Sequence, residues 1–441
     1  MMMKNKLIGG LQMNEIIEKT VSKQGLNLHF IPTKKFKTLT FVAKLRAPLK
    51  RETISKRALL PFVLRQATQS YTNRTDLQLK LDDLYGAVLS IDGTKKGEEH
   101  IISFRMEIAN ERYLPGEDTF TKEALQLLEE LMFKPYLENE HFSEKIFNRE
   151  KSTLKQRIQA IRDNKIRYAN MRLIDEMCGD EAYGIHVNGY EADLDSLTNE
   201  ELYRYYKEII TTDQFDFYVV GDFNPDGMEN EITAVINSQA KEKPIERVFS
   251  EYEKKMELNE VIEKEPIQQA KLHIGYRTNT VYSDKDYPAL QVFNGIFGGY
   301  PSSKLFINVR EKNSLAYYAS SQLESHKGLL FVLSGIAPED FEQARDIIRE
   351  QMQEMKTGNF TDDEIEEIKE MLIHSFRETM DNNHGLVELF YQQQVADTKF
   401  SLEELFSRIN AVTKEDVVQV AGKVEEDTLY LLTSEGGEQN E

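Results

Sequence analysis

The sequence contains very little cysteine: Cys178 is the only thiol in 441 residues. A single cysteine cannot form an intrachain disulfide or a cysteine-based metal cluster, and its scarcity fits a reducing compartment. A lone thiol could act as a nucleophile, but a small buried side chain is the commoner role of a free cysteine. We therefore interpret Cys178 as a residue that packs a helix.

Long apolar stretches are also missing. The sequence has no run of about 18 apolar residues, so it predicts no transmembrane helix. Residues 1–11 include an apolar run that is too short for the core of a signal peptide, and no small-residue cleavage site follows it. We therefore expect a cytoplasmic protein that does not bind membranes.

Basic residues are outnumbered: 55 Lys and Arg stand against 75 Asp and Glu, which gives a formal net charge of −20. An acidic surface repels the phosphates of DNA and RNA, so general nucleic-acid binding is excluded. With 40% hydrophobic and 29% charged residues, the composition is that of a globular protein. The length suggests two domains.

Hydrophobic periodicity predicts strands and helices in an order that occurs twice. Strands are predicted over residues 25–31, 38–46, 86–94, 99–108, 215–220, 269–277, 316–322, 328–334 and 428–433. Helices are predicted over 54–69, 75–84, 120–133, 140–162, 165–177, 287–297, 302–312, 339–356, 362–380, 385–396 and 402–409. Capping boxes at Thr198 and Thr413 open two further helices, nearly half the chain apart.

The repeated order predicts two homologous α+β domains, each a mostly antiparallel sheet covered by helices. We place the N-terminal domain at 14–239 and the C-terminal domain at 267–435. Residues 240–266 are dense in Lys and Glu and carry Pro244 and Pro266 near their ends. This composition predicts a charged, solvated linker between the domains.

No catalytic motif emerges from the residues alone. None of the eight histidines lies in H-E-x-x-H or H-x-x-E-H, the spacings that place two histidines and a carboxylate on one helical face for zinc. The nearest fragment begins at His141 and has no second histidine one turn away. There is no G-x-S-x-G elbow, and the glycines of 295–299 match neither phosphate-loop pattern.

One segment carries a specific resemblance. Residues 298–317, GGYPSSKLFINVREKNSLAY, resemble the GGG-x-SSRLF-xx-VREK-x-GLAY signature of the insulinase/pitrilysin zinc-metallopeptidase family, which includes mitochondrial-processing-peptidase-like proteins. Residues 183–198 and the strand at 218–223, YVVGDF, also resemble stretches of that family. The resemblance implies two homologous domains in each chain, and two such halves that close as a clamshell around a peptide.

In this family the zinc site lies in the N-terminal domain of one half, where the substrate peptide is added as a strand to a sheet edge. The facing C-terminal domain of the other half supplies an arginine and a tyrosine seven residues apart. Arg310 and Tyr317 match these two positions. A guanidinium can hold a carbonyl or carboxylate with forked donors, and a phenol can donate to a developing oxyanion. The resemblance therefore predicts that Arg310 and Tyr317 bind substrate.

The zinc-site positions depart from the family. Leu59, Phe62 and Val63 stand where active members carry the His, Glu and His of H-x-x-E-H, and Arg157 stands at the third ligand. Aliphatic and aromatic side chains cannot coordinate zinc, and an arginine repels it. The general base that would activate zinc-bound water is missing as well. We therefore predict a degenerate zinc site, no metal and no catalytic residue in this chain.

The leading hypothesis is a non-catalytic subunit of a bacterial heterodimer, in which a homologous, zinc-competent partner holds the metal and processes peptides or unfolded protein segments. An isolated chain could instead pair as a homodimer. The alternative is an inactive homologue that acts as a peptide-binding or scaffold protein. Relatives with this pattern are associated by name with modification of elongation factor P. A third hypothesis, an independent enzyme that uses Cys178, has the least support.

Overall fold

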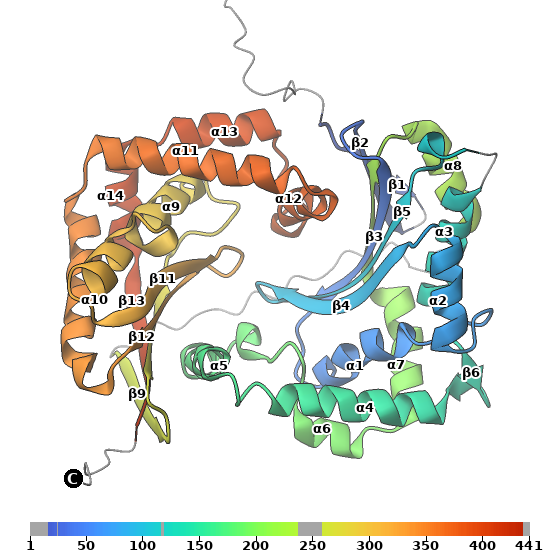
Figure 1. Cartoon of the computed structure of the whole chain (residues 1–441), viewed down its shortest axis with the longest axis horizontal. Helices are drawn as coiled ribbons and strands as arrows, with labels where there is room; N and C mark the ends of the chain where they lie inside the picture. Colours follow the sequence, from blue (N-terminus) through green and yellow to red (C-terminus); the bar gives the residue numbers. More distant parts are fainter. Residues whose placement is uncertain (1–15, 24, 116–118, 237–257, 435–441) are drawn as a thin grey trace, which may run out of the picture.

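The computed structural model describes residues 16–23, 25–115, 119–236 and 258–434. Each half of the chain contains one main sheet with helices packed against it, and the two halves lie side by side (Figure 1). The prediction of two α+β domains with mostly antiparallel sheets is confirmed. None of the described helices combines the length and the apolar character needed to cross a membrane.

The first half is built on a six-stranded sheet in the order β1-β2-β8-β3-β5-β4, in which only β2 and β8 pair in parallel. Its strands are β1 (Lys19–Lys23), β2 (Leu26–Pro32), β3 (Thr38–Pro48), β4 (Val88–Lys96), β5 (Glu99–Ala109) and β8 (Gln214–Gly221). Its helices are α1 (Ile54–Leu64), α2 (Arg74–Asp83), α3 (Phe120–Phe133), α4 (Glu144–Gln159), α5 (Lys165–Cys178), α6 (Glu191–Ser196), α7 (Asn199–Thr212) and α8 (Pro225–Val235). Short elements are η2 (Glu111–Tyr113), the pair β6 (Leu137–Glu138) and β7 (His141–Phe142), and η3 (Ala182–Gly184).

The second half is built on a five-stranded sheet in the order β11-β12-β10-β13-β9, in which β9 and β13 pair in parallel. Its strands are β9 (Asn259–Glu265), β10 (Ala270–Arg277), β11 (Ala316–Glu324), β12 (Leu329–Ile336) and β13 (Glu425–Ser434). Its helices are α9 (Tyr287–Asn294), α10 (Phe341–Thr357), α11 (Asp362–Thr379), α12 (Asn383–Ala396), α13 (Leu402–Asn410) and α14 (Lys414–Lys423). Two π-helical turns, η4 (Gly295–Gly299) and η5 (Phe306–Glu311), precede β11, and η6 (Pro338–Asp340) follows β12.

Strand β3 is buried on both faces because helices cover both sides of the first sheet. Phe41 and Leu45 belong to the large apolar core beneath α1, α3 and α7. Val42 points the other way, into a second core with residues of α11, α12 and α13. Neighbouring side chains of a strand lie on opposite faces of the sheet. Apolar side chains therefore occur on both faces of β3, because each face packs against a core.

The two halves exchange helices. α12 of the second half packs against β3 and β8, where the amide of Asn383 donates to Thr38 and Thr40 at 2.9 Å each. In return, α5 of the first half packs against β10 and β13 (Figure 1). At Gly275 a Cβ atom would lie 2.6 Å from the sulfur of Met177, so this glycine lets α5 approach the sheet closely.

Cys178, at the end of α5, is buried in this contact. Burial raises the pKa of its thiol to about 12, so the side chain stays protonated at neutral pH. It packs among apolar residues of α5 and the second sheet, as the sequence predicts.

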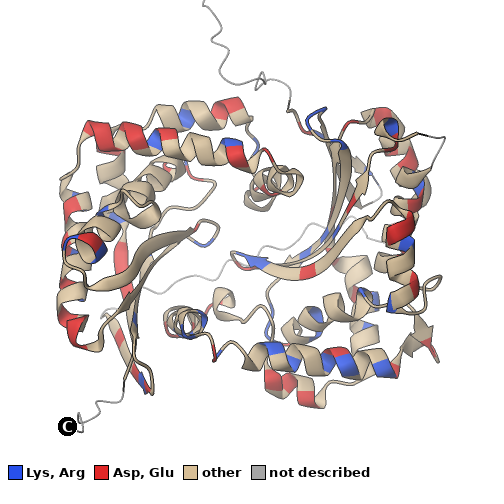
Figure 2. Ribbon diagram, viewed as in Figure 1, with Lys and Arg blue, Asp and Glu red and all other residues tan. Residues whose placement is uncertain are grey.

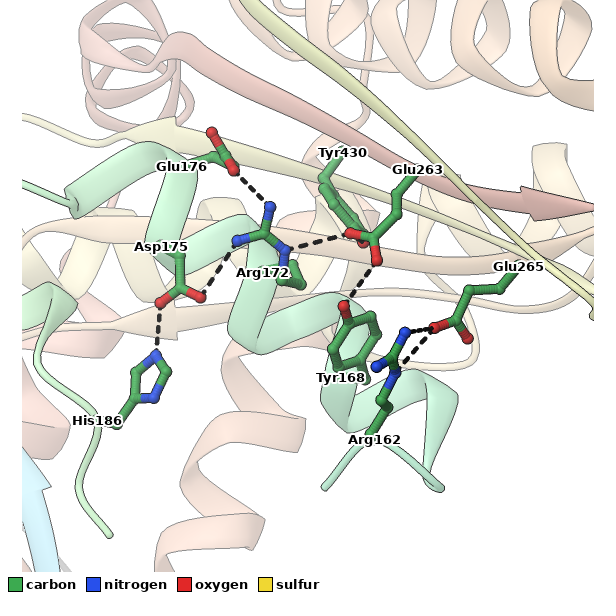
Figure 3. A network of polar contacts seen from close by, with 9 residues as sticks. All are labelled: Arg162, Tyr168, Arg172, Asp175, Glu176, His186, Glu263, Glu265 and Tyr430. Atoms are coloured by element: carbon green, nitrogen blue, oxygen red, sulfur yellow. Dashed lines mark hydrogen bonds and ion pairs between the residues drawn. The ribbon is translucent and has the colours of Figure 1, made fainter. Parts of the chain in front are cut away.

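A polar network links α5 to the edge strand β9 and its neighbour β13 in the second sheet (Figure 3). The Glu263 carboxylate on β9 accepts hydrogen bonds from the Tyr168 hydroxyl at 2.7 Å and the Arg172 guanidinium at 3.2 Å, both on α5. The Tyr430 hydroxyl on β13 donates a third bond at 2.7 Å. One carboxylate thus joins a helix of the first half to two strands of the second.

Strand β9 corrects the predicted linker, because residues 259–265 form a strand that pairs with β13. The charges in this segment have partners far back in the sequence. Glu265 pairs with Arg162 at 3.0 Å, 103 residues earlier, and with Lys165. Because the ionic partners of this strand are so distant in the sequence, its own composition cannot be distinguished from that of a solvated linker. The remaining linker residues, 240–257, lie outside the described residues.

Other differences are local. The helix predicted over 54–69 ends at Leu64, and the one predicted over 302–312 is a π-helical turn at Phe306–Glu311. The sequence analysis did not predict β1, α6 or α8. β1 is short and carries a hydrophobic residue only at its centre, so its periodicity is weak.

We expect Glu263→Gln to lower the free energy of unfolding by about 2 kcal/mol, because the charge-assisted bond to Arg172 is lost and Tyr168 and Tyr430 keep only a neutral acceptor. Glu260→Gln on the same strand is the matched control, since Glu260 is exposed. It should stay within about 0.5 kcal/mol of the parent protein. Urea unfolding followed by circular dichroism measures both; equal effects of the two changes would contradict the role of Glu263.

The contribution of Glu263 should depend on pH. Burial raises the pKa of this carboxyl, but hydrogen bonds from Tyr168, Tyr430 and Arg172 outweigh burial and hold the pKa below its ordinary value. The stabilisation is therefore complete above the unfolded pKa of about 4.3 and is lost as pH falls through the folded pKa. Unfolding curves should show a constant difference between parent and Glu263→Gln near neutral pH and a shrinking one below about pH 4. A difference that persists at the acid end would contradict this.

Candidate functional site: a metal-free pocket and an exposed Arg/Tyr segment

The first site residues lie on α1, which a buried arginine anchors to the sheet. The Arg57 guanidinium donates to Nδ1 of His100 at 3.0 Å and to the backbone oxygen of Leu45 at 2.9 Å. It also pairs with the buried carboxylate of Asp213 at 2.6 Å. Burial, together with the nearby Arg57 charge, lowers the pKa of His100 well below its ordinary value, so this imidazole is a neutral acceptor.

The predicted zinc-site positions on α1 are apolar and buried. Leu59 and Val63 face the core of the first half, and Phe62 lies at its boundary. The structure brings Arg157 of α4 to Phe62: its guanidinium carbon is 5.6 Å from the centroid of the ring. Arg65 also lies over this ring, at 4.7 Å. The two positions predicted for the general base and the third zinc ligand are therefore neighbours in space.

A cavity of about 130 Å³ lies beside Phe62. Its lining comes from α1, α4, the edge strand β4 and the segment 187–188, and comprises Ala58, Phe62, Arg65, Ser90, Ile91, Asp92, Gly93, Arg157, Val187 and Asn188. The described part of the chain has no cluster of three or more His, Cys, Asp or Glu side chains placed to hold a metal ion. The donor set around the cavity does not fit zinc.

Gly189 docks the 187–188 segment onto α1. Its φ of +71° is unfavourable for other residues, and a Cβ atom there would lie 2.6 Å from the Cα of Ser55. The Ser55 hydroxyl accepts a hydrogen bond from the backbone N–H of Tyr190 at 3.0 Å. This close approach closes one side of the cavity.

Arg310 lies in η5, just before the second sheet's edge strand β11, and Tyr317 is the second residue of that strand. Arg310 is at the end of η5, with its guanidinium carbon 4.5 Å from the Phe306 ring centroid and its Nε 3.7 Å from the Glu311 carboxylate. The chain then folds back: the backbone N–H of Ser314 donates to the Arg310 carbonyl at 3.0 Å, and Ser314 has a φ of +54°. η5 therefore packs against β11.

Tyr317 is 72% exposed although it lies within a strand. The pairing of β11 with β12 shifts between Ala316 and Tyr318, so Tyr317 is the extra residue of a β-bulge. A bulge turns its side chain away from the regular alternation. The ring of Tyr318 packs over Gly335, where a Cβ atom would lie 2.4 Å from it.

The two edge strands meet at their turns. The backbone N–H of Gly97, after β4, donates to Glu324 at 3.3 Å, and Lys327, after β11, pairs with Glu98 at 2.6 Å. Lys327 also pairs with Glu181 at 2.6 Å. Sequence reasoning missed this contact because each residue lies in an ordinary polar turn, with its partner more than two hundred residues away.

Comparison with known proteins identifies the family. A family model described as "Peptidase M16 inactive domain" matches residues 196–372. The "Probable inactive metalloprotease YmfF" of Bacillus subtilis is 47% identical over 414 residues, which cover 94% of this chain and 97% of that protein. The "Uncharacterized zinc protease YmxG" of the same bacterium is 24% identical over 334 residues, which cover 73% of this chain and 77% of that protein.

Among solved structures, that of a conserved protein from Enterococcus faecalis V583 aligns with a TM-score of 0.88 and 34% identity, covering 96% of this chain and 100% of that one. The fold, and a cavity whose lining has one carboxylate and no histidine, define a peptidase-like protein whose described residues offer no ligand set for zinc. The chain belongs to the M16, or insulinase/pitrilysin, metallopeptidase family and is an inactive homologue within it.

We expect that the triple change Leu59→His, Val63→His and Arg157→Glu restores zinc binding at about one ion per chain, since it rebuilds two histidines on one helical face and a carboxylate opposite them. The matched control is Leu60→His, Leu64→His and Arg157→Glu, which moves the same spacing by one residue along α1 to positions that are equally buried. Metal content after dialysis is measured by atomic emission.

Each buried histidine costs about 1–3 kcal/mol, so circular dichroism must first show that both variants are folded. Zinc bound by the folded control as tightly as by the rebuilt variant would show that the positions are misassigned, as would a folded rebuilt variant that holds no zinc.

Proposed function

We propose that this chain is the non-catalytic subunit of a zinc-metallopeptidase heterodimer in the bacterial cytoplasm, and that Arg310 and Tyr317 contact the substrate in the partner's chamber. The single observation that carries the proposal is Tyr317, an aromatic side chain that is 72% exposed on a bulge of an edge strand. A large aromatic residue turned out to solvent beside an exposed arginine is typical of a binding surface.

Two features support a division of roles between two chains. This chain has Leu59, Phe62 and Val63 at the positions where zinc ligands and the base are expected, so it has no means to activate water there. Bacillus subtilis carries both a protein named as an inactive metalloprotease and one named as a zinc protease, and both are similar to this chain. These two names support a pairing of an inactive chain with a homologue that holds zinc.

The chemistry of the two residues suits peptide hydrolysis. When bound in the partner, zinc would polarise a water molecule and the scissile carbonyl. The Tyr317 hydroxyl would donate to the oxyanion that develops on that carbonyl, and Arg310 would hold a neighbouring carbonyl or carboxylate with its forked donors. Neither side chain is held by a carboxylate in a close ion pair: Arg310 is 3.7 Å from Glu311, and both of those side chains are exposed.

The test is co-expression of this chain with its nearest H-x-x-E-H-bearing homologue, followed by purification and cleavage of a quenched fluorescent peptide mixture. We expect the two chains to co-purify and only the pair to cleave. Tyr317→Phe or Arg310→Ala should lower the cleavage rate about tenfold to a hundredfold while the complex still forms. The first change removes the donor to the developing oxyanion, and the second removes the donors that hold a neighbouring carbonyl or carboxylate.

Tyr113→Phe is the matched control for Tyr317→Phe. Tyr113 is also exposed, at 44%, and its hydroxyl donates only to Asp222, on the surface of the first half. The heterodimer that contains Tyr113→Phe should cleave the peptides at the rate of the parent heterodimer. If no complex forms, or if the partner cleaves equally well alone, the chain is better explained as a peptide-binding or scaffold protein.

A further inference from the structure

The cavity beside Phe62 carries positive charge. Arg65 and Arg157 both place guanidinium groups against the Phe62 ring, at 4.7 and 5.6 Å from its centroid. A guanidinium on an aromatic face keeps its forked N–H donors free at the rim, where a ligand can reach them. Both arginines line the cavity.

These two charges are poorly neutralised. Apart from the ring, Arg157 has no hydrogen-bond or ion-pair partner among the described residues. The carboxylate nearest Arg65 is that of Glu150, at 3.9 Å, and Glu150 is closer to Arg149, at 2.7 Å. Asp92 is the one carboxylate in the lining, against the two guanidinium groups. The cavity therefore carries a net positive charge in a protein whose net charge is −20.

Helix α4 adds to this surplus. It carries five basic residues and two acidic ones: Lys145, Arg149, Lys151, Lys155 and Arg157 against Glu144 and Glu150 (Figure 2). Lys155 is paired with Glu191 and Asp195 on α6, at 3.1 and 2.9 Å. Of the basic residues of α4, only Arg157 lines the cavity, and its charge has no carboxylate partner among the described residues.

A free strand edge leads to the cavity. β4 is the last strand of its sheet and pairs only with β5, so the N–H and C=O groups on its other edge have no strand partner among the described residues. Residues 90–93 of β4 line the cavity. An extended peptide that hydrogen-bonds to this edge would therefore have one end at the two arginines. A neighbouring hollow of about 280 Å³ shares Arg65 and continues along β4.

We propose that this cavity binds the C-terminal carboxylate of an extended peptide whose preceding residues pair with the free edge of β4. The planar forks of Arg65 and Arg157 match a planar carboxylate. The volume of about 130 Å³ is well below the roughly 300–1,000 Å³ of pockets that enclose whole small molecules, so it suits a single terminal group. The site belongs to the first half of this chain and does not require a partner subunit.

The test uses the purified full-length chain alone and fluorescence anisotropy. The probe is an N-terminally fluorescein-labelled heptapeptide of alternating threonine and valine with a free C-terminus. We expect it to bind at least tenfold more tightly than the same peptide with a C-terminal amide, since the amide cannot form the charge-assisted bonds. A third probe, the amidated peptide with glutamate as its last residue, distinguishes a side-chain carboxylate from a terminal one.

Arg157→Gln should remove most of the preference for the free acid, and Arg157→Glu should abolish it. Arg204→Gln is the matched control, because Arg204 is exposed on α7 and lines no cavity of this site. It should bind as the parent does. The proposal is overturned if acid and amide bind alike, if Arg157→Gln keeps the preference, if the side-chain carboxylate binds as tightly as the terminal one, or if the free acid does not bind at millimolar concentration.

Discussion

Each half of the chain depends on a helix from the other half. α12 covers the face of the first sheet that its own helices leave open, and α5 does the same for the second sheet. Burying a side chain as large as Phe390 or Tyr391 contributes roughly 1.5–3 kcal/mol, so detaching either helix would expose a costly apolar face. The two halves are therefore one folding unit.

This exchange holds the edge strands β4 and β11 in place. Their turns touch through Gly97, Glu98, Glu324 and Lys327, and a separation of the halves would break these contacts together with both exchanged helices. In the proposed heterodimer, a chamber would then open between the two chains and not within this one. Arg310 and Tyr317 lie on the edge that such a partner could approach, because both are exposed.

Hydrophobic periodicity in the sequence predicted most of the helices and strands, because amphipathic helices and half-buried strands each have a characteristic period. The proximity of Phe62 and Arg157 could be predicted only from the family resemblance, because no pattern in their own segments indicates that they lie close together. Contacts between distant segments could not be predicted from the sequence. β9 has the composition of a linker, and its partners Arg162 and Arg172 lie about a hundred residues earlier. The bulge at Tyr317 was also unpredictable, because it depends on how β11 pairs with β12.

At the positions proposed for a zinc site, the charge of this chain has the same sign as that of a bound zinc centre. A zinc ion with two neutral histidines and one carboxylate leaves a net positive charge that attracts carbonyl and carboxylate oxygens. Here the two guanidinium groups of Arg65 and Arg157 outnumber the one carboxylate of the lining, Asp92, so a positive charge remains as well. A guanidinium does not share with a metal ion the power to lower the pKa of a bound water molecule. Under the proposal above, such a pocket would hold a carboxylate without activating water to attack it.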